Sequence, residues 1–472
     1  METSQNRFVY LDNIRNFLVC NVVLFHVILM FTYPMVFYWA VIDKEGSSRI
    51  YETAVASMSI YLMPCLLFIA ALFIFPALKK VTPLEYIKKR FLRLYVPVIV
   101  FLFCAGEIAP QLLLNRLNSV PPTYFETFLN GWRGFINMPG IYLTGSGTGS
   151  SFVVYGFQHT WFLTFLFFIT LIVVVLSLPF KRKSSEPENA DKRETIILKT
   201  ILLAVVLGIF YAAAMVYYSI LGITPGPFLI IGKVVSFPNH QVWVLLPLFL
   251  FGLYAYRKEW LTKGDIGSWK MWGTMAFIFL ALYVLLQHSV CMPAIEEMMK
   301  VAEHNRLFDN KMPRPPMSPS TQLAFLGTYL LESLACVFLL MFFLSFAKMF
   351  FNKTNAITTF CSKHSINVYV LHLIPVFILQ YTFMNVPITP IIKIILMAII
   401  IIPACLWLSH RLVYPYPKIA IAFFVALKLA ALAAGFTFYY YALLVLIFIS
   451  FAGAVYESAM FMVAQKASLK PV

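Results

Sequence analysis

An arginine and a histidine lie eleven residues apart in the first long apolar segment, within Tyr10–His26 (YLDNIRNFLVCNVVLFH). On a helix, eleven steps of about 100° bring Arg15 and His26 to nearly the same face, about 16 Å apart along the axis. Asp12 precedes Arg15 by one turn and is placed to bind its guanidinium. Ionisable groups are costly in a membrane helix, so this pair indicates a protein interior or a wet cavity. Two structural alternatives remain open: Arg15 as a headgroup anchor, and His26 as a hydrogen-bonded core residue.

Two further motifs place polar side chains in apolar surroundings. In SINVYVLH, Ser365, Tyr369 and His372 are spaced i, i+4 and i+7, which puts them on one helical face. In FQHTWFL, His159 and Trp161 stand at the outer end of another apolar segment. Histidine accepts and returns a proton near neutral pH, so His26 and His372 are candidate bases. The structural alternatives are a polar seam between helices and an interfacial tryptophan.

The third apolar segment combines an internal carboxylate with a basic start. Glu107 lies in the middle of this segment, where we expect it to be neutral or hydrogen-bonded to a neighbouring helix. The stretch KKRFLRLYVP at its start holds Arg90 and Arg93. The usual excess of basic residues on the cytoplasmic side accounts for most of that charge.

The composition excludes an ordinary soluble protein. Hydrophobic residues make up 61% of the chain and charged residues 12%, and the mean hydropathy is +0.82. Several stretches exceed the roughly 18 apolar residues that mark a membrane-spanning helix. Because backbone polar groups in lipid must be satisfied within a segment, we expect an all-α polytopic membrane protein. The seven cysteines form no C-x-x-C pair, which argues against disulfides and a thiolate metal site.

Basic residues set the expected orientation of twelve membrane-crossing segments. The even-numbered linkers and the tail hold 23 lysines and arginines, whereas the odd-numbered linkers hold nine. The even linkers and both termini are therefore expected in the cytoplasm. This distribution explains the net charge of +16 without a nucleic-acid partner. A tight turn around Gly435 is expected between the last two segments. The segments are 14–38, 52–78, 92–114, 159–179, 197–221, 241–257, 269–290, 321–348, 364–385, 388–410, 418–434 and 437–460.

Two outer linkers are long, but neither is large enough for an independent domain. Residues 115–158 contain the run LTGSGTGSS, which has no lysine at phosphate-loop spacing. This run predicts a flexible surface loop. Residues 291–320 open with PAIEEMMKVAEHNRLF, which predicts a short helix.

Taken in order, these motifs resemble those of acyltransferase family 3, a family of polytopic membrane enzymes. One motif departs from the family's pattern: its F-F-x-x-S-G reads LLFIAALF here, with Ala70 and Ala71 in place of Ser-Gly. The matching positions are Arg15 and His26 in LDNIRNFLVCNVVLFH, Arg90, Arg93 and Pro97 in KKRFLRLYVP, His159 and Trp161 in HTWFL, Pro247, Phe249 and Gly252 in LLPLFLFGLYAY, and Ser365, Tyr369 and His372 in SINVYVLH.

The resemblance covers residues 8–410 and implies a membrane O-acyltransferase domain, followed in 411–472 by two additional helices and a short cytoplasmic tail. Family members move an acyl group from cytoplasmic acyl-CoA to a hydroxyl of an extracytoplasmic glycan or related acceptor. The resemblance thus implies an inner-membrane enzyme with acyl-CoA as donor substrate and no permanently bound cofactor or metal. YLDNIR and HTWFL are most similar to the members that succinylate periplasmic glucans. An acetyl, succinyl or similar group is therefore expected.

The resemblance also suggests roles for the matching residues. His26 is the expected general base, and His372 a second base or relay. The alternative function is a proton-coupled transporter or flippase of a glycan or lipid-linked intermediate, which would use the same histidines without turning over acyl-CoA. The other expected roles are acyl-CoA phosphate binding by Arg90, Arg93 and Arg15, oxyanion stabilisation by Arg15 or Tyr369, and substrate contact by His159, Trp161, Tyr369 and Ser365.

Overall fold

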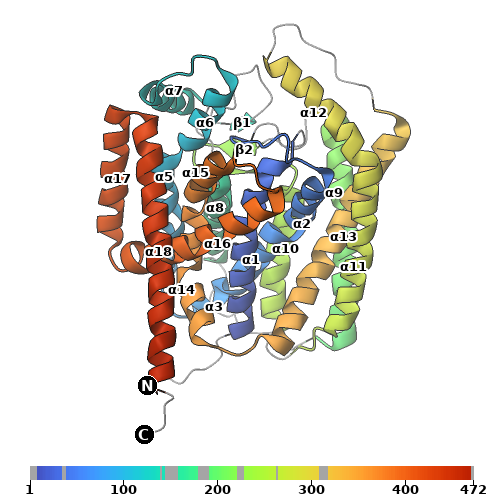
Figure 1. The fold of residues 1–472 in the computed structure, drawn as a ribbon. Helices are drawn as coiled ribbons and strands as arrows, with labels where there is room; N and C mark the ends of the chain where they lie inside the picture. The colour runs from blue at the N-terminus through green and yellow to red at the C-terminus, as the bar shows by residue number, and fades with distance from the viewer. Residues whose placement is uncertain are drawn as a thin grey trace.

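The computed structural model describes residues 8–33, 39–138, 141–143, 158–178, 191–220, 228–261, 264–307 and 317–468. Most of these residues form helices that run through one bundle (Figure 1). The helices are α1 Val9–Ile28, α2 Arg49–Leu72, α3 Ile74–Leu78, α4 Pro83–Arg90, α5 Val96–Ala105, α6 Ile108–Leu117, α7 Tyr124–Asn137, α8 Trp161–Ser177, α9 Arg193–Ile220, α10 Val242–Arg257, α11 Trp269–Leu286, α12 Met292–Leu307, α13 Pro319–Phe350, α14 Ala356–Leu371, α15 Leu373–Phe383, α16 Pro390–Leu408, α17 Pro417–Ala434 and α18 Phe436–Ser468.

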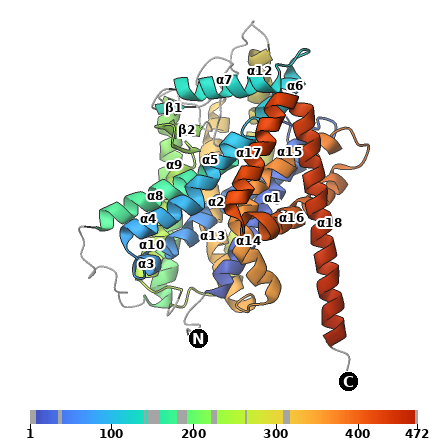
Figure 2. The ribbon, with the colours of Figure 1, turned by 90° about the vertical axis from the view of Figure 1, so that its left-hand side faces the viewer.

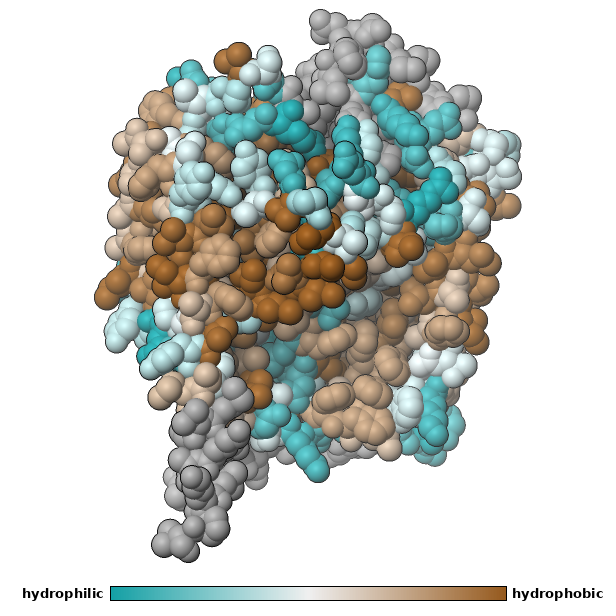
Figure 3. Space-filling view, viewed as in Figure 1, coloured by the Kyte–Doolittle hydropathy of each residue, from teal (hydrophilic) through white to brown (hydrophobic). Residues whose placement is uncertain are grey.

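Within the described part of the chain, ten helices are long and apolar enough to cross a membrane. The bent pair α14 and α15 makes eleven if it is counted as one span. The remaining expected segment is α10, which is apolar but has only 16 residues. The expected helical class is therefore confirmed, and the described residues contain ten or eleven full spans where twelve segments were expected. The space-filling view fits this reading, because a hydrophobic belt crosses the middle of the molecule between hydrophilic ends (Figure 3).

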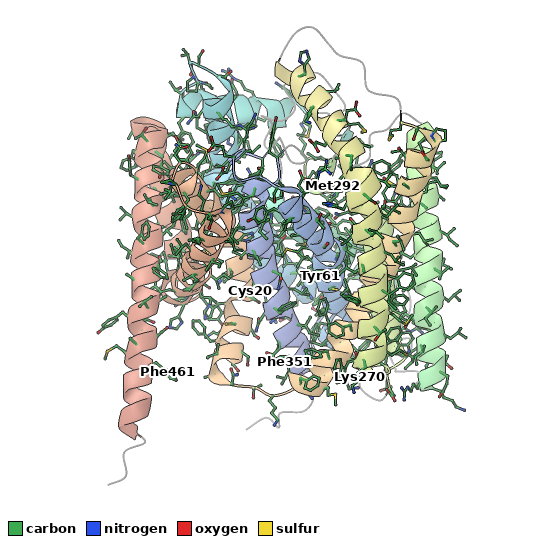
Figure 4. The ribbon with its side chains drawn as sticks, turned by 45° about the vertical axis from the view of Figure 1, so that its right-hand side comes forward. Cys20, Tyr61, Lys270, Met292, Phe351 and Phe461 are labelled. Atoms are coloured by element: carbon green, nitrogen blue, oxygen red, sulfur yellow. The ribbon has the colours of Figure 1, made fainter. Side chains whose placement is uncertain are left out.

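α1 begins and α18 ends at the same end of the bundle (Figures 1 and 2). Lys270 also lies at this end, whereas Met292 lies towards the other end of the same continuous span (Figure 4). We call the end with Lys270 the basic face, and the opposite end, which carries α7 and α12, the loop face. The expected short helix after residue 291 is α12. The expected flexible run LTGSGTGSS lies outside the described residues from position 144 onward.

Local sequence explains where several helices begin and end. The Thr123 hydroxyl accepts from the backbone N–H of Glu126, whose side chain accepts in return, which forms a capping box at the start of α7. Ser318 caps α13 just before Pro319, a residue suited to the first helical turn. The expected turn at Gly435 separates α17 from α18, and its φ of +93° suits a residue without a Cβ.

A small antiparallel sheet on the loop face was not predicted. Its three strands are β1 Ile141–Leu143, β2 Phe228–Ile231 and β3 Val235–Pro238, in that spatial order. Gly232, Lys233 and Val234 join β2 to β3. Gly232 and Lys233 hold a positive φ, and the Val234 N–H donates to the Ile231 carbonyl (3.2 Å), which closes a tight turn. β3 is tied to α8 because the Ser236 N–H donates to the Thr164 hydroxyl (3.4 Å). The sheet therefore covers the loop-face end of α8.

The glycine of the LLPLFLFGLYAY motif permits a close approach between α10 and α2. A Cβ added at Gly252 would lie 2.7 Å from the Phe68 carbonyl oxygen and 2.9 Å from the Cβ of Ala71. Ala71 belongs to the LLFIAALF stretch that departs from the family's pattern. Because its methyl group already fills this contact, α2 and α10 tolerate alanine there but not a larger side chain.

Candidate active site

α1 and the helix of the SINVYVLH motif, α14, pack side by side and run in the same direction. Near the basic face, the Arg15 guanidinium donates to the carbonyl oxygen of Ser362 (3.2 Å). Eleven residues further along α1, Nδ1 of His26 lies 3.2 Å from Nε2 of His372, which directly follows α14. Arg15 and His26 therefore face the same partner helix, as their spacing predicts.

The chain bends by 60° at His372, between α14 and α15. Pro375 explains the bend: it has no N–H to donate to the carbonyl of Leu371, so that turn of helix is open. The expected span 364–385 is thus two helices rather than one. His372 is fully buried at the bend, where its side chain meets α1.

A third histidine completes the site. His159 lies in the short 3₁₀ turn η3 (Gln158–Thr160) before α8, and its ring centroid is 4.8 Å from that of His372 and 6.1 Å from that of His26. The Tyr369 hydroxyl donates to the carbonyl oxygen of His159 (2.6 Å). We call His26, His159 and His372 the histidine cluster. The sequence suggested His159 only as a substrate contact, and the structure places it beside both candidate bases.

Backbone carbonyls determine which ring nitrogens carry protons, because a carbonyl only accepts. Nδ1 of His26 faces the Val22 carbonyl (2.8 Å), and Nδ1 of His372 faces the Tyr369 carbonyl (2.8 Å). Both nitrogens are therefore protonated in the neutral rings. The Nδ1–H of His26 is then shared with Nε2 of His372, and Nε2 of His26 keeps a lone pair.

His159 has the opposite tautomer. Its Nε2 faces the carbonyls of Tyr369 (3.0 Å) and Val370 (3.2 Å), so Nε2 carries the proton. Its Nδ1 is buried and meets no hydrogen-bond partner among the described residues. The cluster thus offers two lone pairs for a proton, one on His26 and one on His159. No group of three or more His, Cys, Asp or Glu side chains in the described ranges is arranged to hold a metal ion.

Two residues that the sequence did not suggest hold the end of α1. The side-chain N–H₂ of Gln380 donates to the carbonyls of His26 (2.9 Å) and Val27 (3.2 Å), which lie in the last turn of α1. The Trp39 indole donates to Oε1 of Gln380 (2.9 Å), and its ring lies 5.9 Å from the His26 ring. A buried glutamine within the apolar stretch FILQYTF was the available signal for this contact.

A cationic region lies nearer the basic face. Arg93, in the π-helical turn η2 (Phe91–Tyr95), interacts electrostatically with Arg15 and Arg90. We call these three residues the arginine group. Asp12 supplies an ion pair to Arg15 (2.9 Å), as expected, and the Tyr86 hydroxyl accepts from Nε of Arg90 (3.0 Å). Because like charges at close range are unfavourable, this arrangement suits a ligand with several negative charges.

Two of the expected substrate contacts are engaged by other parts of the fold. The Ser365 hydroxyl donates to the carbonyl of Ser362 on its own helix (3.2 Å). Trp161 is buried and packs against Phe228 of the sheet, with ring centroids 6.1 Å apart. These contacts give both residues a structural role in α14 and at the start of α8. Their expected contact with substrate stays a prediction.

Of three comparisons with known proteins, one finds a match. No curated protein and no solved structure matches the chain. A family model described as an acyltransferase domain, that of acyltransferase family 3, matches residues 8–410. This match covers well over half of the 472 residues and includes every member of the histidine cluster and the arginine group. α17 and α18 lie beyond it. The chain is therefore a multi-pass membrane protein that belongs to acyltransferase family 3.

Proposed function

We propose that this protein is a membrane O-acyltransferase that uses acyl-CoA as donor and a hydroxyl of an extracytoplasmic glycan or related molecule as acceptor. The observation that carries this proposal is the pair of partners that face Nδ1 of His26, from which its tautomer follows. Its Nδ1–H is bound to the Val22 carbonyl and to His372, so its Nε2 is free to accept a proton. The second observation is the arginine group, whose Arg15 lies on the same helix as His26, about 16 Å away along the axis.

The proton and the acyl group move in opposite directions in this reaction. Nε2 of His26 removes the proton of the acceptor hydroxyl while the hydroxyl oxygen attacks the thioester carbonyl carbon. The C–S bond then breaks, the new ester C–O bond remains, and the CoA sulfur takes the proton from His26. His372 accepts the Nδ1–H of His26 throughout, which fixes the ring and favours its protonated form.

The arginine group would hold the phosphates of acyl-CoA. A planar guanidinium binds phosphate through paired hydrogen bonds, which favours arginine over lysine here. The pantetheine arm of CoA is long, narrow and flexible, so it would follow α1 from this group towards the histidine cluster. Arg15 is too far along the axis from His26 to bind the thioester there, and we assign it to the phosphates.

The hydrogen bonds also refine the roles expected for Tyr369, His159 and His372. The Tyr369 hydroxyl is committed to the His159 carbonyl, so we assign Tyr369 to positioning His159 rather than to the oxyanion. His159, with its unprotonated Nδ1, is placed to contact the acceptor hydroxyl or the leaving group. His372 becomes an orienting residue rather than a second base.

The orientation follows from charge. We propose that the basic face lies in the cytoplasm and that the membrane is the bacterial inner membrane, with both termini on the cytoplasmic side. Cysteine introduced at Glu45, on the outer side of this arrangement, should react with an impermeant thiol reagent in intact cells. Cysteine introduced at Lys353 should not react. Labelling at Lys353 alone would reverse the orientation.

The decisive test uses purified protein with isotopically labelled acyl-CoAs and a glycan fraction from the native envelope. Mass spectrometry should show the label on a hydroxyl of the acceptor, with release of one free CoA thiol per acyl group transferred. Acceptor movement across proteoliposomes with no CoA release would instead identify a transporter or flippase.

A further inference from the structure

The break between α5 and α6 provides a hydrogen-bond acceptor for the active site. Gly106 and Glu107 separate the two helices, and Pro110 explains the break. Proline has no N–H, so the carbonyl of Gly106, four residues earlier, receives no intrahelical hydrogen bond. Nε2 of Gln158 donates to that carbonyl instead (2.9 Å). Gln158 directly precedes His159 of the histidine cluster.

The position of His159 depends on this break. Gln158 holds a φ of +42°, which is uncommon for a residue other than glycine and persists only where the surroundings fix it. Its hydrogen bond to Gly106 is one such restraint. Phe101 of α5 also packs edge-on against the His159 ring, with centroids 4.8 Å apart. A shift of the α5–α6 break would therefore move His159.

The two C-terminal helices hold the break from the other side. Nζ of Lys428, on α17, lies 2.6 Å from Oε2 of Glu107, and both side chains are 0% exposed. Lys428 also donates to the Tyr124 hydroxyl (2.8 Å). The Tyr439 hydroxyl, on α18, donates to the carbonyl of Cys104 at the end of α5. α17 lies alongside α5, although it is beyond the residues that the family model matches (Figure 2).

Stability alone is a poor explanation for a fully buried ion pair. The cost of removing two charges from water often equals or exceeds their mutual attraction, and neutral pairs of the same volume are frequently as stable. What a buried pair adds is a defined geometry. Here Glu107 fixes the break at one point, and Lys428 is itself fixed by the aromatic rings of Tyr124 and Phe128, 4.4 and 4.9 Å from Nζ.

We propose that the Glu107–Lys428 pair positions the active site. Through the α5–α6 break and Gln158, it holds His159 where the acyl group and the acceptor hydroxyl meet. α17 and α18 are then part of the catalytic unit of this protein rather than an appendage. This inference rests on the proposed acyl transfer, and it assigns Glu107, Lys428 and Gln158 as positioning residues that do not touch the substrate.

The test replaces the pair by neutral residues of similar size, Glu107→Gln with Lys428→Met. Either single variant leaves one buried charge without its partner and is expected to unfold easily. The double variant should keep thermal stability close to that of the wild type, with an unchanged KM for acyl-CoA. Its kcat should fall roughly ten- to a hundredfold, the size of effect expected from misplacing a reacting group by about 1 Å.

A second variant follows the same path. Gln158→Met removes the hydrogen bond to Gly106 and should lower kcat by a similar factor. Because both changes release the same restraint, adding Gln158→Met to the double variant should cause little further loss. Glu457→Gln, on α18, is the matched control. It removes the ion pair to Arg411 (2.7 Å), which lies in the turn after α16 and away from the break, and should leave kcat unchanged.

The outcomes separate this inference from the proposed function. No transfer by the wild type would reject the acyltransferase proposal itself. Normal kcat in a stable double variant would show that the pair only stabilises the fold and would overturn the inference. Independent, multiplicative losses from the pair and from Gln158→Met would also overturn it, because they would place the two on separate paths.

Discussion

The histidine cluster and the arginine group are linked by α1, which carries His26 and Arg15, but they differ in charge and hydrogen bonding. His159 and His372 are 5% and 0% exposed, and each ring donates to backbone carbonyls. The Arg15 side chain is 26% exposed and stands among further cations. A nearby cation opposes protonation of an imidazole. Separating the two regions by about three helical turns therefore lets one bind a polyanion while the other remains basic.

Of the substitutions that test this comparison, His26→Gln should have the largest effect on the acyl-transfer rate. The variant keeps hydrogen-bonding groups but cannot shuttle a proton, so the acyl-transfer rate should fall about 10²–10⁴-fold. Initial rates on detergent-purified protein of normal thermal stability provide the measurement. His288→Gln, a histidine on the α11–α12 span, serves as control and should be fully active. Near-normal transfer by His26→Gln would leave His159 as the base.

His372→Asn should cause a smaller loss, roughly ten- to a hundredfold, because His372 positions His26 and does not itself receive the proton. The expected signature is a lower kcat with unchanged KM values for both substrates. A loss as large as that of His26→Gln would return His372 to the role of second base. Single-turnover rates measured at saturating acyl-CoA separate these two results.

Arg93→Ala should affect donor binding rather than chemistry. The KM for acyl-CoA should rise about tenfold, with kcat within about twofold of the wild type. The effect should be strongest at low ionic strength, because partly exposed charges are screened by salt. Lys89→Ala is the matched control, since Lys89 lies one turn before Arg93 but pairs with Glu85 (2.7 Å) in solvent. An unchanged donor KM would remove the arginine group from acyl-CoA binding.

Arg90→Ala should have the smallest effect, a rise in the acyl-CoA KM of about two- to fivefold. Its guanidinium already binds the Tyr86 hydroxyl and lies 5.2 Å from that ring, so it is less available than Arg93. Exposed charge pairs contribute about 0–1 kcal/mol, which corresponds to this range. The informative measurement is the ratio of the acyl-CoA KM of Arg93→Ala to that of Arg90→Ala. A larger rise for Arg90→Ala would make Arg90 the more important donor contact.

Patterns within one helix could be read from the sequence. Hydropathy predicted the spans, the eleven-residue spacing placed Arg15 and His26 towards one partner, and Gly435 marked a turn because its φ of +93° favours glycine. The spans and the shared face of Arg15 and His26 could be predicted because both depend on the length and period of a single helix. Pro375 carried a signal for the bend at His372 that hydropathy alone does not register.

Contacts between distant segments could not be predicted. The sequence placed Glu107 in an apolar segment, but its partner Lys428 lies 321 positions later, on a helix outside the recognisable motifs. Gln380 and Trp39 are likewise far from His26 in the chain, and neither belongs to a periodic pattern. Which buried polar group meets which depends on helix packing, and one sequence does not encode that in its local spacing.

The buried lysine of α17 also constrains the order in which the chain enters the bilayer. A lysine near the centre of a spanning helix costs about 2.5–3.5 kcal/mol to insert, and α17 has only 18 residues. Synthesis runs from the N-terminus, so Glu107 is in the membrane well before Lys428 leaves the ribosome. The hairpin of α17 and α18 therefore meets a counter-charge that is already in place. Biogenesis of this enzyme thus ends with the docking of its last two helices onto a completed core.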